Sequence, residues 1–192
     1  MPPWETETTM APVKVILTYD DYVTLPNDGK RYEIHEGELS VTPTPTFRHQ
    51  WILAELLGIL RAHVVAHDLG EVVPAPITVV LAETLIVEPD IIYIAKDRMH
   101  IVSARGTVDG APTLAVEILS PSTTRIDRQT KKQLFERYGV PYYWIVDADA
   151  RTIEVYRAVS AVYGLPERRA GDDLSDLPPF PGLRIDATTL WR

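Results

Sequence analysis

The chain has 192 residues, no cysteine and a formal net charge of −8 at pH 7. The missing cysteine excludes disulfides, thiolate metal sites and a cysteine nucleophile, and it suits a reducing cytosol. The net acidity argues against a protein that coats nucleic acid nonspecifically, because such binding depends on neutralising phosphates. The sequence shows neither a secretory signal nor an apolar run long enough to cross a bilayer, which predicts a cytoplasmic protein without membrane association.

Length and patterning predict a single folded domain. Residues 1–13 are expected to be a disordered leader, and residues 14–192 the domain. Strands between and around two main helices predict an α/β fold in which helices flank a mixed sheet. The expected helices are 18–25, 47–67 and 124–138; the expected strands are 31–35, 38–42, 71–73, 76–81, 91–94, 113–119, 142–146, 152–156 and 183–185, with 158–182 as a connection.

Acidic side chains within apolar strands carry the main functional signal. The glycine-rich dinucleotide motif, the Walker loop, HExxH and the GxSxG elbow are all absent. Glu117 lies in a strand with apolar residues on both faces, so its carboxylate must be paired, protonated or bound to a metal. The alternative is a buried salt bridge or a strand-end acid.

Two further acids are candidates. Asp90 stands at the entrance of the apolar strand 91–94, where an ordinary turn aspartate is the alternative. It gains functional weight if Asp90 and Glu117 meet at neighbouring strand ends. Glu33 lies between apolar neighbours and is a plausible third carboxylate, unless it faces solvent.

A lysine on the helix expected over 124–138 points towards the core. At 100° per residue, Lys131 lies near the centre of the apolar face, with Asp127 beside it. A lysine directed inward reaches naturally for a buried carboxylate. The alternative is a local i,i+4 pair between Asp127 and Lys131.

Other residues are candidates for contacting a substrate. His49 opens the long helix and either touches substrate or caps the helix. A basic patch on the following helix includes Arg125, Arg128 and Lys132, which either contact a nucleic-acid backbone or form a solvated face.

Several segments, taken in chain order, carry a family resemblance. They are residues 31–39 (RYEIHEGEL), His49, residues 89–90 (PD), residues 116–123 (VEILSPST), Asp127 with Lys131, and residues 139–147 (GVPYYWIVD). Together they closely resemble the Uma2 endonuclease family of the PD-(D/E)XK, restriction-endonuclease-like superfamily. The resemblance covers about residues 18–191, nearly the whole chain.

The resemblance implies a restriction-endonuclease-like core with its active site at one end of the central strands. Asp90 matches the superfamily aspartate, Glu117 the acid of (D/E)XK, and Glu33 an acid of the family's first motif. The chain departs from the superfamily pattern at Leu119, which stands where the motif has lysine. In this family the lysine is moved to the next helix, where Lys131 stands.

The function that the resemblance implies is metal-dependent hydrolysis of phosphodiester bonds, with DNA as the expected substrate. Mg²⁺ or Mn²⁺ would be held by Asp90, Glu117 and the Ile118 carbonyl. A homodimer is expected by analogy. Two alternatives stay open. One is a catalytically degenerate nuclease-fold module for DNA binding or assembly, favoured by Leu119 and the net acidity, and the other is a hydrolase of small phosphate compounds.

Overall fold

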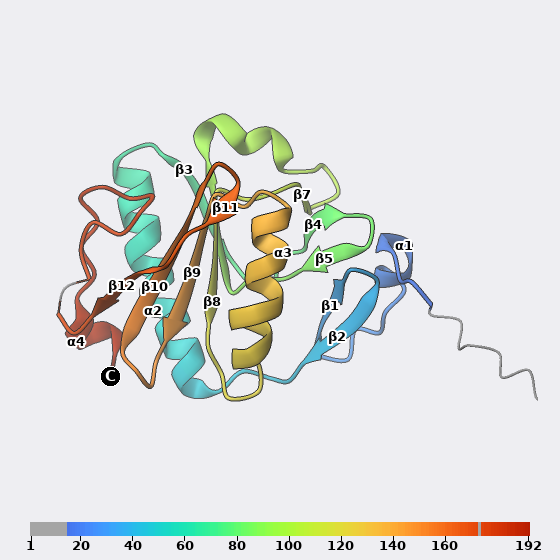
Figure 1. The fold of residues 1–192 in the computed structure, drawn as a ribbon, viewed down its shortest axis with the longest axis horizontal. Coiled ribbons are helices and arrows are strands. Elements are labelled where there is room, and N and C mark those ends of the chain that lie inside the picture. The colour runs from blue at the N-terminus through green and yellow to red at the C-terminus, as the bar shows by residue number, and fades with distance from the viewer. Residues whose placement is uncertain (1–14, 173) are drawn as a thin grey trace, which may run out of the picture.

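The structure, a computed structural model, describes residues 15–172 and 174–192. Two β-sheets lie side by side, and helices cover both faces of the larger one (Figure 1). This arrangement confirms the predicted α/β architecture of a mixed sheet flanked by helices. The leader expected over residues 1–13 lies outside the described residues.

The larger sheet has the strand order β11-β10-β9-β8-β6-β3, and β12 also pairs with β10. Only the central β8–β9 pair is parallel, so the sheet is mixed. Its strands are β3 (Gly70–Pro74), β6 (Ile91–Ala95), β8 (Leu114–Ile118), β9 (Tyr142–Asp147), β10 (Thr152–Val159), β11 (Val162–Tyr163) and β12 (Glu167–Ala170).

The smaller sheet has the strand order β2-β1-β5-β4-β7. Its strands are β1 (Arg31–His35), β2 (Glu38–Thr42), β4 (Val79–Ala82), β5 (Leu85–Val87) and β7 (Val108–Asp109). The two predicted strands β1 and β2 form a hairpin that turns at Glu36 and Gly37, with φ of 50° and 85°. Two successive positive φ values are what a tight hairpin turn requires, and glycine adopts them without strain.

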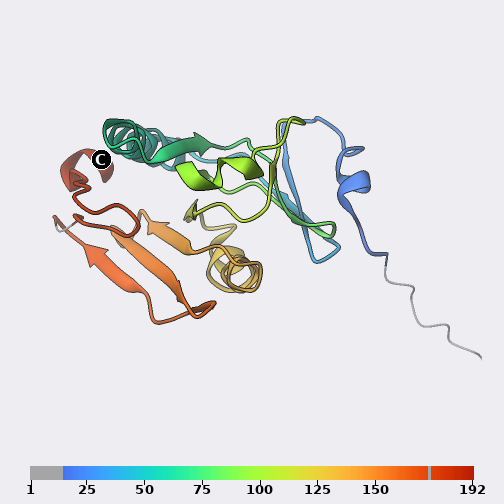
Figure 2. The ribbon, with the colours of Figure 1, turned by 90° about the horizontal axis from the view of Figure 1, so that it is seen from above.

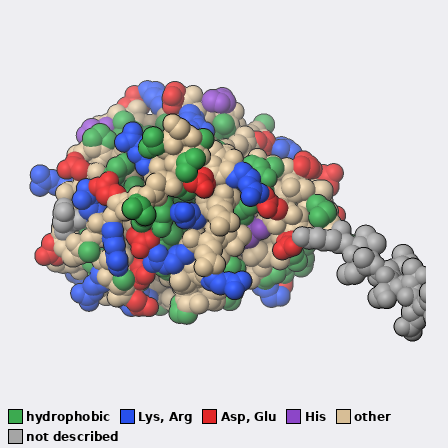
Figure 3. Space-filling view, viewed as in Figure 1, with side chains coloured by type: hydrophobic (Ala, Val, Ile, Leu, Met, Phe, Trp, Pro, Cys, Tyr) green, Lys and Arg blue, Asp and Glu red, His purple; other side chains and the backbone are tan. Residues whose placement is uncertain are grey.

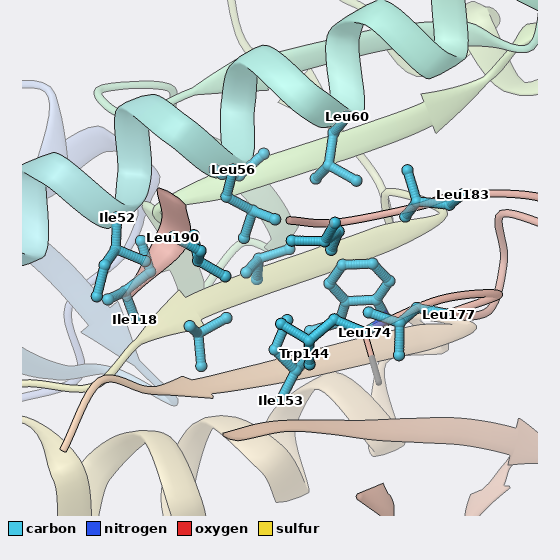
Figure 4. Packing of buried hydrophobic residues seen from close by; sticks show 14 of the residues in the cluster. Ile52, Leu56, Leu60, Ile118, Trp144, Ile153, Leu174, Leu177, Leu183 and Leu190 are labelled. Carbon is cyan, nitrogen blue, oxygen red and sulfur yellow. The ribbon is translucent and has the colours of Figure 1, made fainter. Parts of the chain in front are cut away.

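Helix α2 (Phe47–Ala66) covers one face of the larger sheet. Its fully buried Ile52, Leu56 and Leu60 recur every fourth residue, the spacing that keeps side chains on one helix face. These side chains meet Trp144 and Ile153 from the sheet (Figure 4). The short helix α4 (Ala187–Leu190) adds to the same layer.

The opposite face is covered by η2 (Ile126–Lys131), a π-helix, and by α3 (Lys132–Arg137), which continues it. Figure 2 shows α2 and α3 on opposite sides of the strands. Phe135 of α3 packs on Tyr143 of β9, with ring centroids 5.0 Å apart. Helix α1 (Tyr19–Tyr22) lies against the smaller sheet, and a 3₁₀ helix, η1 (Lys96–Ile101), follows β6.

Some predicted elements are wrong in detail. The strand expected over 183–185 is only an isolated bridge between Ser175 and Arg184. Residues 158–182, expected as a connection, contain β11 and β12, and the predicted elements also lack β5 and β7. The four strands that were not predicted are two to four residues long. Such short strands form because a neighbouring strand supplies their hydrogen bonds, and their own sequences are too short to show a strand pattern. In the described ranges, no helix combines the length and apolar character needed to cross a bilayer.

Candidate active site

Strand pairing brings Asp90 and Glu117 together. β6 and β8 are antiparallel and Ile91 faces Val116, so Asp90, just before β6, lies beside the end of β8. The Ile118 amide donates to Asp90 Oδ2 at 2.8 Å. The two acids are only 1% and 3% exposed. The condition set from the sequence, that both acids meet at neighbouring strand ends, is fulfilled.

Lys131 reaches across from the helical layer to these strands. Its Nζ lies 2.8 Å from Glu117 Oε1 and 2.9 Å from Glu33 Oε1, but 4.0 Å from Asp127 Oδ1. The predicted inward direction of Lys131 is therefore confirmed, and its local i,i+4 contact is the longest of the three. Glu117 does form a buried salt bridge, as the alternative for that residue had it.

The lysine sits on an irregular turn rather than on the regular helix assumed from the sequence. Residues Ile126–Lys131 are π-helical, with i→i+5 hydrogen bonds that make the turn wider than an α-helical one. Tyr143 Oη, from β9 below, donates to the Asp127 carbonyl at 3.0 Å. Such π-turns occur often at functional sites.

Glu33 completes the carboxylate set. It is 1% exposed, so the solvent-facing alternative is wrong. Its Oε1 accepts hydrogen bonds from the Glu88 amide at 2.7 Å and from Lys131, and its Oε2 lies 3.0 Å from His35 Nε2. Glu33 thus fixes Lys131 from the smaller sheet while Glu117 fixes it from the larger one.

Arg31 belongs to the site although the sequence analysis gave it no role. Its Nη1 donates to Asp90 Oδ1 at 2.8 Å and lies 3.4 Å from the Glu88 carbonyl. Arg31 precedes Glu33 by two residues on β1, so both side chains leave the same face of the strand. That alternation is the signal by which the sequence could have indicated Arg31.

His49 also points into the site. Its ring is 7% exposed, and Nε2 lies 3.2 Å from Asp90 Oδ1. Among the described residues, neither ring nitrogen has a partner in hydrogen-bond geometry. The helix cap comes instead from Thr46, whose hydroxyl accepts from the His49 amide at 3.3 Å. The ring is thus buried beside Asp90, and its Nδ1 is open to a further partner.

These side chains line a pocket of about 150 Å³. We call it the acidic pocket and define it by Arg31, Glu33, His49, Asp90, Glu117, Asp127 and Lys131. The pocket lies where the two sheets meet, because Glu33 comes from β1, Glu117 from β8 and Lys131 from η2.

The basic patch does not come to this pocket. Arg128 pairs with Glu154 at 2.7 Å and Asp147 at 3.0 Å, and Lys132 Nζ lies 5.2 Å from the centre of the Tyr156 ring. Arg125 is exposed, and none of the three basic residues lines the acidic pocket. On the face shown in Figure 3, basic and acidic side chains are interspersed.

Comparison with known proteins identifies the family. The Uma2 family model, described as "Putative restriction endonuclease", matches residues 19–188. The chain belongs to the Uma2 family. A crystal structure from Anabaena variabilis ATCC 29413, described as "a putative nuclease belonging to DUF820", is similar with a TM-score of 0.75 and 22% identity over 91% of this chain and 97% of that one. The predicted restriction-endonuclease-like fold is confirmed. No curated protein matches the sequence.

Burial and charge set the ionisation of this Uma2 pocket. Burial raises the pKa of Glu117 well above its usual range despite Lys131, and it raises the pKa of Asp127 to about 6. Burial also raises the pKa of Glu33 and Asp90, but their partners lower it below the ordinary value: chiefly Lys131 and His35 at Glu33, and His49 and Arg31 at Asp90. Glu117 and Asp127 are therefore the two acids that bind protons most readily.

The residues of the acidic pocket suit a hard divalent cation by their chemistry. Four carboxylates face two permanent cations, Lys131 and Arg31, which leaves an excess of negative charge when all four are ionised. Carboxylate and carbonyl oxygens are the ligands preferred by Mg²⁺ and Mn²⁺. Within the described ranges, no three His, Asp or Glu side chains already form a metal cluster, since Lys131 stands between Glu33 and Glu117.

Proposed function

We propose that this Uma2 protein is a divalent-metal-dependent endonuclease that hydrolyses DNA phosphodiester bonds at the acidic pocket. The observation that carries the proposal is the position of Lys131, buried and bridging Glu33 and Glu117 from two different sheets beside Asp90. A lysine among carboxylates at a strand end is the arrangement expected of this nuclease fold.

Each residue has a role that its position supports. Asp90 and Glu117, with the Ile118 carbonyl, would hold Mg²⁺ or Mn²⁺, which lowers the pKa of water and offsets phosphate charge when bound. Lys131 would orient the attacking water or stabilise the negative charge that develops on the phosphate. Glu33 holds the Lys131 ammonium in place through its 2.9 Å contact.

Two polar side chains at the pocket wall would bind the phosphate. The hydrogen bond from Arg31 Nη1 to Asp90 holds the guanidinium at the pocket. A guanidinium matches the geometry of phosphate oxygens well. The buried His49 ring holds Nε2 3.2 Å from Asp90 Oδ1, and its Nδ1 has no hydrogen-bond partner among the described residues. Of the basic patch, Arg125 is exposed and available to a flanking backbone, whereas Arg128 and Lys132 would first have to leave their present contacts.

The experiment is metal-dependent nicking of supercoiled plasmid DNA, with Mn²⁺, Mg²⁺ or EDTA and with an RNA strand as a parallel substrate. Wild type should nick plasmid with a divalent metal and not in EDTA, and Glu117→Gln should lose the activity. Asp147→Asn is the matched control, because Asp147 is an ion-paired acid outside the pocket. Full activity in Glu117→Gln would remove this site from consideration, and cleavage of RNA alone would overturn the DNA assignment.

A second candidate is a catalytically degenerate module that binds DNA or assembles other proteins. Leu119 at the motif's lysine position and the net charge of −8 favour it. Such a module would retain labelled DNA in a mobility-shift assay equally well in EDTA and in Mn²⁺ and would leave it uncut.

If the protein does cut both strands, we expect two copies to act together, and light scattering would then give the mass of a homodimer.

A further inference from the structure

A second and larger pocket opens beside the acidic pocket, and the proposed hydrolysis does not use it. Its volume is about 520 Å³, within the range of pockets that hold small organic ligands. The two pockets share Arg31 and residues 42–45 as a common wall. We call the larger one the tyrosine pocket, after Tyr22 and Tyr32 in its lining.

The tyrosine pocket joins aromatic rings to a carboxylate. The Tyr22 hydroxyl donates to Glu88 Oε1 at 2.8 Å. In the described part of the chain no hydrogen bond reaches the other carboxylate oxygen of Glu88, which lines the pocket and is half-buried. Gln50 contributes an amide to the same lining. Flat rings with an acceptor and an amide are the groups that bind an unpaired nucleobase, by stacking and by hydrogen bonds to its edge.

Strand geometry places this pocket on the other side of β1 from the catalytic carboxylates. Tyr32 alternates with Arg31 and Glu33 along β1. Because Ile34 faces Ile86 in the antiparallel β1–β5 pair, continuing that register puts Glu88 opposite Tyr32. The two pockets therefore meet only around the start of β1, where Arg31 Nη1 contacts both Asp90 Oδ1 and the Glu88 carbonyl.

Ion pairs between side chains near the pockets disfavour binding of a duplex through its phosphate backbone. Three cations near the pockets are already paired: Lys30 with Asp28 at 2.8 Å, Arg48 with Asp149 at 2.7 Å, and Arg128 with Asp147 and Glu154. Arg125 is exposed and stands outside these pairs. Affinity for a duplex comes largely from phosphate neutralisation, which these pairs and the net charge of −8 weaken. Binding of single strands draws additionally on base stacking against aromatic rings.

We propose that the tyrosine pocket holds an unpaired nucleobase next to the scissile phosphate, so that the substrate is single-stranded or locally opened nucleic acid. The inference rests on the proposed function, because it assigns the scissile phosphate to the acidic pocket. If the phosphate is bound at Arg31, the adjoining base must pass around the start of β1 to enter the tyrosine pocket. A base can take that position only after it has left the stack of a duplex.

The test is binding measured by fluorescence anisotropy, which is read separately from cleavage. The probes are a labelled DNA strand, the same strand as a blunt duplex, and an RNA strand of the same sequence, each in EDTA and in Ca²⁺. The single strand should bind about tenfold more tightly than the duplex in at least one of these buffers. Tyr32→Leu should weaken binding of the strand about tenfold, the usual scale for losing one stacked base.

Matched variants separate stacking from folding. Tyr32→Phe keeps the ring and removes only the hydroxyl that donates to Asp28, so it should recover most of the binding lost in Tyr32→Leu. Tyr138→Leu, a partly exposed tyrosine outside the tyrosine pocket, should have no effect. Circular dichroism of each variant verifies the fold.

The outcomes distinguish this inference from the proposed function. The inference is overturned if the duplex binds as tightly as the single strand or more tightly. It is also overturned if Tyr32→Leu binds the strand as wild type does, or if the strand does not bind in either buffer. Each of these results counts against the inference even if plasmid is nicked. The expected binding pattern without any metal-dependent cleavage supports the subsite and overturns the endonuclease. Tighter binding of RNA than of DNA would keep the unpaired base and reassign its source.

Discussion

Lys131→Met tests the electrostatic account of the acidic pocket. The change removes the ammonium of a residue that is 4% exposed and keeps most of the side-chain volume. At 2.8 and 2.9 Å, each carboxylate contact amounts to roughly 6 kcal/mol of Coulomb energy at an effective dielectric constant of about 20. Desolvation offsets much of this, and deleting one partner of such a buried pair costs about 3–5 kcal/mol.

The expected loss of unfolding free energy is therefore about 3–5 kcal/mol at pH 7, measured by urea denaturation. The deficit should shrink at acidic pH. Without Lys131, the folded-state pKa of Glu33 rises and that of Glu117, already above its usual range, rises further. Protonation therefore stabilises the folded variant as the pH falls. Adding Glu117→Gln to Lys131→Met should recover part of the loss at pH 7, because one of the uncompensated carboxylates is gone.

The control is Lys132→Met, the neighbouring lysine that lies over the Tyr156 ring outside the pocket. It should change the free energy of unfolding by less than about 1 kcal/mol. The reasoning is refuted if Lys131→Met is as mild as Lys132→Met, or if its deficit is the same at pH 5 and pH 7.

Three further predictions concern stability. Burial raises the pKa of Asp127 to about 6 from an ordinary 3.8. Wild type should therefore lose stability relative to Asp127→Asn as the pH rises from about 4 to about 6. Equal pH profiles of thermal unfolding for the two proteins would contradict this. Leu56→Ala empties a fully buried position between α2 and the sheet and should cost about 2–5 kcal/mol in urea denaturation. Gly37→Ala should cost more than Gly29→Ala, because both have positive φ but only a Cβ at Gly37 would lie 2.6 Å from Ile16 Cγ2; equal melting temperatures would argue against that close contact.

Local patterns in the sequence were sufficient for much of the fold. The four-residue spacing of Ile52, Leu56 and Leu60 predicts α2 and its buried face, and the Glu36–Gly37 turn predicts the β1–β2 hairpin. Burial of Glu117 also follows from its own strand, because the neighbours on both faces are apolar. Each of these features depends on residues within a few positions of one another.

The remaining features depend on partners far away in the chain. Arg31 and Asp90 are 59 residues apart in the chain, and they meet only because of how the two sheets join. Arg128 turns away from the pocket because Asp147 and Glu154 lie beside it. The π-turn at Ile126–Lys131 is supported by Tyr143 from β9. No periodicity within 124–138 contains that information.

The most direct measurement of the central claim is a calorimetric titration of Mn²⁺ into the protein, which needs no choice of substrate. The account predicts that wild type and Asp147→Asn bind Mn²⁺, and that Asp90→Asn and Glu117→Gln lose this binding while remaining folded. Wild type that binds no Mn²⁺, or Asp90→Asn and Glu117→Gln variants that both bind it as wild type does, would contradict a metal-dependent nuclease site in the acidic pocket.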